Sequence, residues 1–224
     1  MSIIEAAHTD VIGKAAVADT LLAHQVYRRA TTLLAEAASS TPVPHEAVRQ
    51  LRDFVVAEVH YHHQAEDNLV WPLIQAADAG APKTLSRLTG EHRSLACALD
   101  LLSRVVVGPD GDDHALRRVA RLVQAQIHEH LAAEELTIMP FLVAHVSDAA
   151  WAKVSRAIVA GAPTEHAHLM FGLLDQVGTS DEVARIVADL PAPARALLPD
   201  LRLAGQATLA AIAPAHTASH LVRR

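Results

Sequence analysis

The sequence contains few aromatic residues and almost no cysteine. Phe, Trp and Tyr make up 3% of the 224 residues although 51% are hydrophobic, so alanine and the aliphatic side chains must supply the core. This balance favours helices, because β-strands select aromatic and β-branched side chains. Cys97 is the single cysteine, which excludes an internal disulfide bond and a metal site built from several thiolates.

The sequence also lacks a basic excess and long apolar runs. The formal net charge is −6 at pH 7, which argues against binding to nucleic acid because such binding needs a basic face. No run of about 18 apolar residues is present, so we expect no membrane span. The opening residues, MSIIEAAHTDVIGK, contain no basic stretch followed by an apolar core. We therefore expect no signal peptide and a cytoplasmic protein.

Four long helical patterns fill the first two thirds of the chain. The turn-rich stretches SSTPVP, AGAP and GPDGDD separate them. The predicted helices cover residues 11–39, 45–78, 83–107 and 113–145. Short connections between long helices imply antiparallel neighbours. The sequence therefore predicts an all-α fold, with an up-down-up-down four-helix bundle over residues 10–146.

The rest of the chain, residues 147–224, has a different pattern. We predict short helices at 147–160, 163–177 and 180–190, followed by a weakly patterned, alanine-rich tail in which prolines interrupt any helix. This C-terminal helical extension is expected to pack on the bundle, to cap one end, or to contact a second subunit. Monomer and homodimer are both compatible with it.

Histidine and glutamate recur in the two halves of the bundle with a fixed offset of 68 residues. Each half has one lone histidine and, 38 residues later, a His-x-x-x-Glu pair. The corresponding residues are His24 and His92, His60 and His128, His62 and His130, and Glu66 and Glu134. Two such halves folded against each other bring imidazoles and carboxylates together, which indicates a metal site.

The predicted helix faces separate inward from outward histidines. At about 100° per residue, His62 and Glu66 fall on the apolar stripe of the second helix, and His130 and Glu134 on that of the fourth. The other members of these stripes are Val55, Val59, Leu69, Leu73, Val123, Ile127, Thr137 and Phe141. His92 shares a face with leucines. His60 and His128 point to the opposite side, and we interpret them as solvated surface histidines. We interpret His166 and His168 in TEHAHLM as structural or surface histidines.

A cation is the partner that this inward cluster requires. Buried carboxylates left uncompensated would each cost several kcal/mol, and neutral imidazoles offset this only in part. Four imidazoles and two bridging carboxylates exceed the needs of one tetrahedral ion and suit two ions roughly 3.5–4 Å apart. Imidazole with carboxylate suits iron, manganese or zinc, so the donor types leave the metal open. A metal-free bundle whose core histidines act as a pH switch is a further hypothesis.

The motifs resemble those of the hemerythrin-like, or HHE cation-binding, family. LLAHQ, the HxxxED that begins at His62, GEHRSL and the HxxxEE that begins at His130 match its arrangement over about residues 10–145. The tail, with DAAWAKV, LLDQV and DLPAPARALL, resembles the extension of actinobacterial members. The resemblance implies a non-heme diiron centre, with two iron ions, four terminal histidines and two bridging glutamates. These residues are His24, His62, His92, His130, Glu66 and Glu134.

The sequence departs from the classical oxygen carriers of that family, which use five histidines with an HxxxH pair on the third helix. Ala96 stands where the second histidine of that pair is expected, so reversible oxygen carriage is in doubt. Tyr27 and His63 are candidates for an additional ligand or for a position beside the metal. Classical members place the carboxylate of the fourth helix at the position of Glu135, whereas the internal repeat favours Glu134.

The resemblance implies a diiron protein that binds or reacts with a small oxidant: dioxygen, hydrogen peroxide or nitric oxide. Catalase-like turnover of peroxide is one form of this reaction. The alternative is a non-catalytic iron-binding module for iron handling or sensing. The donor residues alone do not decide whether the protein is an enzyme.

Overall fold

Four long helical rods form a bundle in the first two thirds of the chain. The computed structural model describes residues 15–40, 42–77 and 80–212, and these contain helices and no strand. The rods are α2 (Ala15–Ala37), α3 (His45–Ala65) with its continuation η1 (Glu66–Val70) and α4 (Trp71–Ala77), α5 (Pro82–Arg104) and α6 (Asp113–His145). The predicted all-α bundle is confirmed. The predicted helical residues 11–14 and 78 lie outside the described residues.

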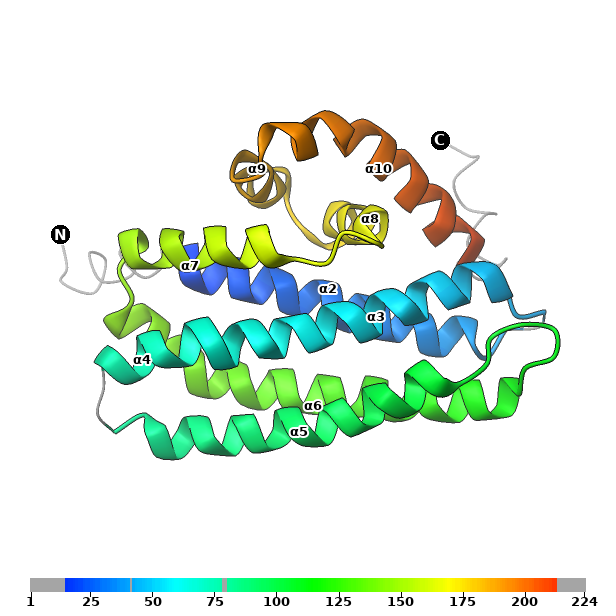
Figure 1. The fold of residues 1–224 in the computed structure, drawn as a ribbon, viewed down its shortest axis with the longest axis horizontal. Helices are drawn as coiled ribbons and strands as arrows, with labels where there is room; N and C mark the ends of the chain where they lie inside the picture. The colour runs from blue at the N-terminus through cyan, green and yellow to red at the C-terminus, as the bar shows by residue number, and fades with distance from the viewer. Residues whose placement is uncertain (1–14, 41, 78–79, 213–224) are drawn as a thin grey trace, which may run out of the picture.

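The four rods of the bundle pack in a ring, and α4 at the end of the second rod also contacts α6. α2 packs against α3 and α6, and α5 packs against the same two helices. Figure 1 shows the rods running alongside one another, with α2 and α3 on the side nearer the C-terminal helices. This ring of contacts, in which the first helix meets the last, is that of an up-down-up-down bundle.

A layer of buried polar residues divides the bundle core into two hydrophobic clusters. Along α5, Leu88 belongs to one cluster and Leu95 to the other, and His92 lies between them. Along α6, one cluster ends at Leu131 and the other begins at Ile138. The polar layer therefore crosses the bundle at the level of the predicted metal site.

The second rod contains a π-helical turn, η1, which begins at Glu66, the last residue of its His-x-x-x-Glu motif. A backbone N–H at the end of this turn bonds to the carbonyl of Glu66 five residues earlier. The extra residue rotates the following side chains by about 100°. Val70 and Ile74 are therefore buried, whereas Leu69 and Leu73 of the predicted stripe are half-buried. The predicted face is correct up to Glu66 and wrong beyond it.

The predicted face of α6 also drifts at its C-terminal end. Thr137 and Phe141, which lie on the predicted stripe, are half-buried, and Ile138 and Leu142 enter the core instead. The reason is that an α-helix has 3.6 residues per turn, so the buried stripe shifts slowly around a helix of 33 residues.

Four further helices form a cap over the α2 and α3 side of the bundle (Figure 1). They are α7 (Asp148–Gly161), α8 (Ala167–Val177), α9 (Ser180–Ala188) and α10 (Ala192–Ile212), and we call them the helical cap. The first three confirm the predicted short helices. The predicted irregular tail is wrong for residues 192–212, which form one helix. Pro193 lies in its first turn, where no helical hydrogen bond is lost, and buried Leu198, Leu209 and Ile212 offset the cost of Pro199. Residues 213–224 of the predicted tail lie outside the described residues.

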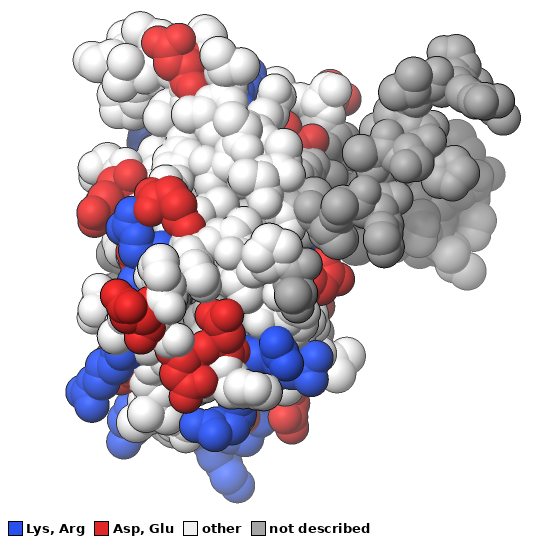
Figure 2. Space-filling model, turned by 90° about the vertical axis from the view of Figure 1, so that its right-hand side faces the viewer, with Lys and Arg blue, Asp and Glu red and all other residues white. Residues whose placement is uncertain are grey.

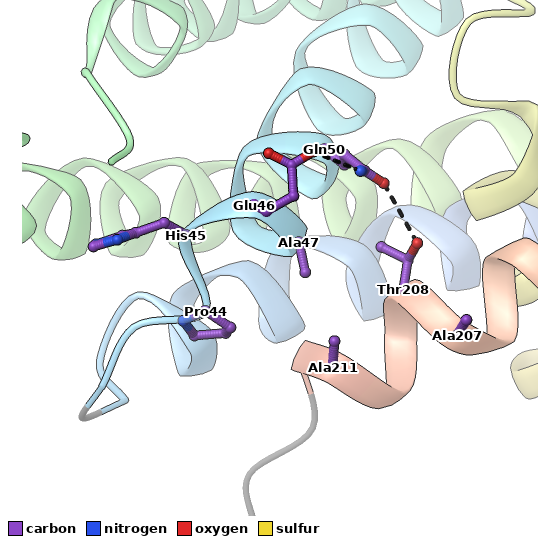
Figure 3. Close-up of a pocket in the computed structure, with 8 residues that line it drawn as sticks. All are labelled: Pro44, His45, Glu46, Ala47, Gln50, Ala207, Thr208 and Ala211. Atoms are coloured by element: carbon purple, nitrogen blue, oxygen red, sulfur yellow. Dashed lines mark hydrogen bonds between the residues drawn. The ribbon is translucent and has the colours of Figure 1, made fainter. Parts of the chain in front are cut away.

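The helix α10 is held against both α8 and α3. At its crossing with α8, a Cβ on Gly205 would lie 2.1 Å from the carbonyl oxygen of His168, so the close approach requires glycine. Figure 3 shows the contact with the start of α3, where the Thr208 hydroxyl donates to Oε1 of Gln50 at 3.4 Å. In the same view His45 points away from α10.

The surface carries charge of both signs. On the end of the molecule shown in Figure 2, Asp and Glu side chains are interspersed with Lys and Arg over the described residues. Within residues 15–40, 42–77 and 80–212, no helix has the length and apolar character needed to cross a membrane.

Candidate metal centre

Seven donor side chains from all four rods meet in the polar layer. They form two sets, within which the donor atoms lie within 4.8 Å of one another. The first, which we call the His24 set, contains His24, His62, Glu66 and Glu134; the second, the His92 set, contains His63, His92 and His130. The six side chains predicted as metal ligands are all present, and His63 joins them.

The two carboxylates of the His24 set also face histidines of the His92 set. Glu66 places Oε1 3.4 Å from Nε2 of His62 and Oε2 3.5 Å from Nε2 of His92. Glu134 places Oε1 3.7 Å from Nε2 of His24 and Oε2 3.4 Å from Nε2 of His130. Each carboxylate therefore offers one oxygen to each set, which is the arrangement needed to bridge two cations.

The inward atoms of this cluster have no hydrogen-bond partner among the described residues. These buried atoms are Nε2 of His24, His62, His92 and His130, Oε2 of Glu66, and both carboxylate oxygens of Glu134. Most buried polar atoms in proteins are hydrogen-bonded. A group of seven unpartnered atoms in one region therefore needs another explanation. Imidazole and carboxylate donors at these separations fit metal ions between them.

The outward nitrogens of three histidines are each held by a carboxylate. His24 Nδ1 lies 2.9 Å from Glu135, His92 Nδ1 lies 3.2 Å from Asp67, and His130 Nδ1 lies 3.0 Å from Glu91. A carboxylate at Nδ1 keeps the proton on that nitrogen and leaves the Nε2 lone pair free to bind a metal. The carboxylates of these three pairs therefore orient the histidines.

Burial governs the protonation of the cluster. It lowers the pKa of His62 to about 3, and it lowers the pKa of His63 and of His92 as well. Burial, followed by the charge of Glu134, raises the pKa of Glu66 well above its ordinary value. Burial thus favours the neutral forms of these three imidazoles and of Glu66, whereas the pKa of His130 is raised, because Glu134 and Glu91 outweigh the effect of its burial. A bound cation would favour the ionised carboxylates and the neutral imidazoles together.

His63 supplies the third imidazole of the His92 set. It is 5% exposed, and its ring stacks on that of His92 with centroids 4.2 Å apart and an interplanar angle of 10°. The sequence made His63 a candidate for an additional ligand or for a position beside the metal, although its repeat partner is Leu131 and it has no symmetric counterpart. In the structure it brings a fifth imidazole to the centre from α3, although Ala96 of α5 supplies none.

We expect His63→Leu to weaken metal binding by at least tenfold, because it removes one of three imidazoles from the His92 set. Titration with ferrous iron, followed by elemental analysis after desalting, measures this loss. His60→Leu is the matched control, since His60 lies three residues earlier on α3 and belongs to neither set. Equal iron retention in both variants would contradict the role assigned to His63.

The other candidates from the sequence lie beside the cluster or away from it. Tyr27 is buried with its ring centroid 4.8 Å from that of His62, and burial raises its pKa well above 10.0. Glu135 contacts His24 and Arg28 from outside the His24 set, and hydrogen bonding to His24 lowers its pKa to about 2. His128 bonds to the α2 backbone and is in neither set.

Three residues of the site were not predicted in their present roles. Glu91 and Asp67 hold histidines of other helices, and the ring of Trp71 stacks on that of His92 with centroids 6.0 Å apart. Contacts between helices produce all three, and a face pattern within one helix carries no signal for them.

Comparison with known families gives a match over most of the four-helix bundle. A model of the hemerythrin HHE cation binding domain matches residues 16–142, which include all seven donor side chains. Searches of curated proteins and of solved structures gave no significant match. The family match covers more than half of the chain, and the four rods with their cluster of histidines and glutamates agree with it. The chain belongs to the hemerythrin HHE cation-binding family.

Proposed function

We propose that this chain is a non-heme diiron protein that binds or reacts with dioxygen, hydrogen peroxide or nitric oxide. The observation that carries the proposal is the position of Glu66 and Glu134, each with one oxygen toward either set. His24, His62, His63, His92 and His130 would be the terminal ligands. This donor set fits two cations better than one.

The two sets are unequal, and this inequality favours a reactive centre. Apart from the shared carboxylates, the His24 set has two imidazoles and the His92 set has three. Histidine and carboxylate donors that leave positions open are typical of non-heme iron sites that react with oxygen. Iron held by these residues would supply redox chemistry, and the His24 set would offer it one imidazole fewer than the His92 set.

The protein residues around the His24 set exclude bulk water and fix the donors. His24 is fully buried, and Tyr27 and Glu66 are nearly so. Glu135 holds the outward edge of His24 and accepts a hydrogen bond from Arg28, so the His24 ring cannot turn away from the centre without breaking its contact with Glu135. A small, uncharged molecule can enter such a site at lower cost than an ion.

Elemental analysis and optical spectroscopy on the same iron-loaded sample test the proposal. We expect about two irons per chain and a spectrum that changes on addition of hydrogen peroxide or nitric oxide. Gas-sensitive measurement of oxygen release then determines whether peroxide is turned over. Full iron loading without a response to any of the three oxidants would identify the alternative, a non-catalytic iron-handling or sensing module. One zinc ion, or no metal after anaerobic reconstitution with iron, would contradict the diiron proposal.

A further inference from the structure

A cavity of about 480 Å³ lies between the helical cap and the α2–α3 side of the bundle. This volume falls within the ~300–1,000 Å³ typical of pockets for small organic ligands. Its walls are mainly apolar and come from both sides, with Val26 and Val70 from the bundle and Ile158, Phe171 and Leu201 from the cap. The cavity exists only because the helical cap covers this face.

One wall of the cavity contains the carboxyl group of Glu58, which has no hydrogen-bond or ion-pair partner among the described residues. Glu58 is 4% exposed. Burial raises its pKa to about 7, so near neutral pH much of it carries a proton and can donate a hydrogen bond. A buried polar group normally has a partner, and the cavity is where a partner for Glu58 can lie.

The charges around the cavity define what it can bind. No lysine or arginine occurs among its described lining residues. Asp19 lines it but is already occupied by Nε1 of Trp151 at 2.9 Å and by Arg185 at 3.2 Å. The Tyr61 hydroxyl donates to the carbonyl oxygen of Ile158. An anionic ligand would be buried in the cavity without a positive counter-charge. A cationic ligand would find no permanent negative counter-charge on the Glu58 carboxyl.

We infer that this cavity binds a neutral, elongated apolar molecule with one hydrogen-bonding oxygen, such as a long-chain alcohol, and that this oxygen lies against Glu58 beside Tyr27. The apolar part of the ligand lies between the helical cap and α2, and it reaches the surface near Leu197, which lines the cavity and is 56% exposed. His62 and Glu66 also line the cavity, so its polar end adjoins the metal centre.

Calorimetric titration of the full-length, iron-loaded protein tests this inference with three probes of equal length: 1-decanol, decanoate and decylammonium. We expect saturable binding of 1-decanol at one site, roughly tenfold tighter than either ion. Ala194→Phe, which fills the cavity from α10, is expected to abolish this binding. Ala196→Phe is the matched control, because Ala196 lies on the same helix, is exposed and does not line the cavity.

A second variant tests the polar end of the cavity. Glu58→Leu keeps the bulk of the side chain and is expected to weaken 1-decanol binding roughly fivefold, the effect of one lost hydrogen bond. The iron content of this variant is expected to stay unchanged, which separates the cavity from the metal centre. Tightest binding of decylammonium or decanoate would overturn the assignment of a neutral ligand. Absence of binding by all three probes, or 1-decanol binding that Ala194→Phe leaves unchanged, would overturn the site itself.

Discussion

Glu134→Gln is expected to lose more than ~100-fold in affinity for both metal ions, because even the loss of a residue that only orients a metal ligand costs about 10–100-fold. Glu134 is fully buried, and its two oxygens lie near His24 and His130, one from each set. Glutamine keeps the shape of the side chain, so the bundle should fold. It removes the negative charge and leaves a single oxygen, which cannot serve both sets.

The measurement is a competitive titration with a chromophoric iron chelator, read together with the iron content after desalting. Glu135→Gln is the matched control from the adjacent position. Glu135 contacts His24 from outside the His24 set, so its loss should weaken iron binding by only about 10–100-fold and leave two ions bound at saturation. If Glu135→Gln loses the metals and Glu134→Gln retains them, Glu135 is the bridging residue and the choice made from the internal repeat is wrong.

Glu58→Gln is expected to make the protein more stable at alkaline pH by ~3 kcal/mol and to have little effect below pH 4.5. Burial raises the pKa of Glu58 from 4.5 to about 7 in the folded protein. Between these two values the folded chain holds a proton that the unfolded chain has released. The contribution of Glu58 to the free energy of unfolding is therefore fully present below pH 4.5 and is lost as the pH rises through 7.

Chemical unfolding of the iron-loaded protein at pH 4.5, 6 and 8 measures this effect. The difference in unfolding free energy between the variant and the wild type should grow with pH at about 1.4 kcal/mol per unit and level off above pH 7. Glu129→Gln on the exposed face of α6 is the control and should show no such trend. A difference that is constant with pH would mean that Glu58 is ionised in the folded protein.

The helices and the inward histidines could be predicted because both follow from local periodicity. His62, Glu66, His130 and Glu134 share faces with apolar residues, and a repeat of 68 residues places the two halves in register. The choice of Glu134 over Glu135 for the centre rested on that repeat, and the structure places Glu134 in the His24 set.

The missed features depend on departures from the repeat or on contacts between elements. The π-helical turn that begins at Glu66 occurs only in the first half, so neither half predicts it from the other. His63 has a leucine as its repeat partner, and its place beside His92 depends on how α3 and α5 pack. The helix α10 was missed because Pro199 lowers its local propensity, which the buried residues of the helical cap outweigh.

The carboxylates that hold the lone histidines have a consequence for assembly. Asp67, from the first half of the bundle, orients His92 of the second half, and Glu135, from the second half, orients His24 of the first. Each of these two pairs joins a residue of the first half to a residue of the second half. A hairpin of α2 and α3 alone therefore contains His24 without its partner. Neither half can prepare its own lone histidine for a metal. Tight metal binding is therefore a property of the completed bundle, and metal uptake during refolding would report the moment at which the two hairpins join.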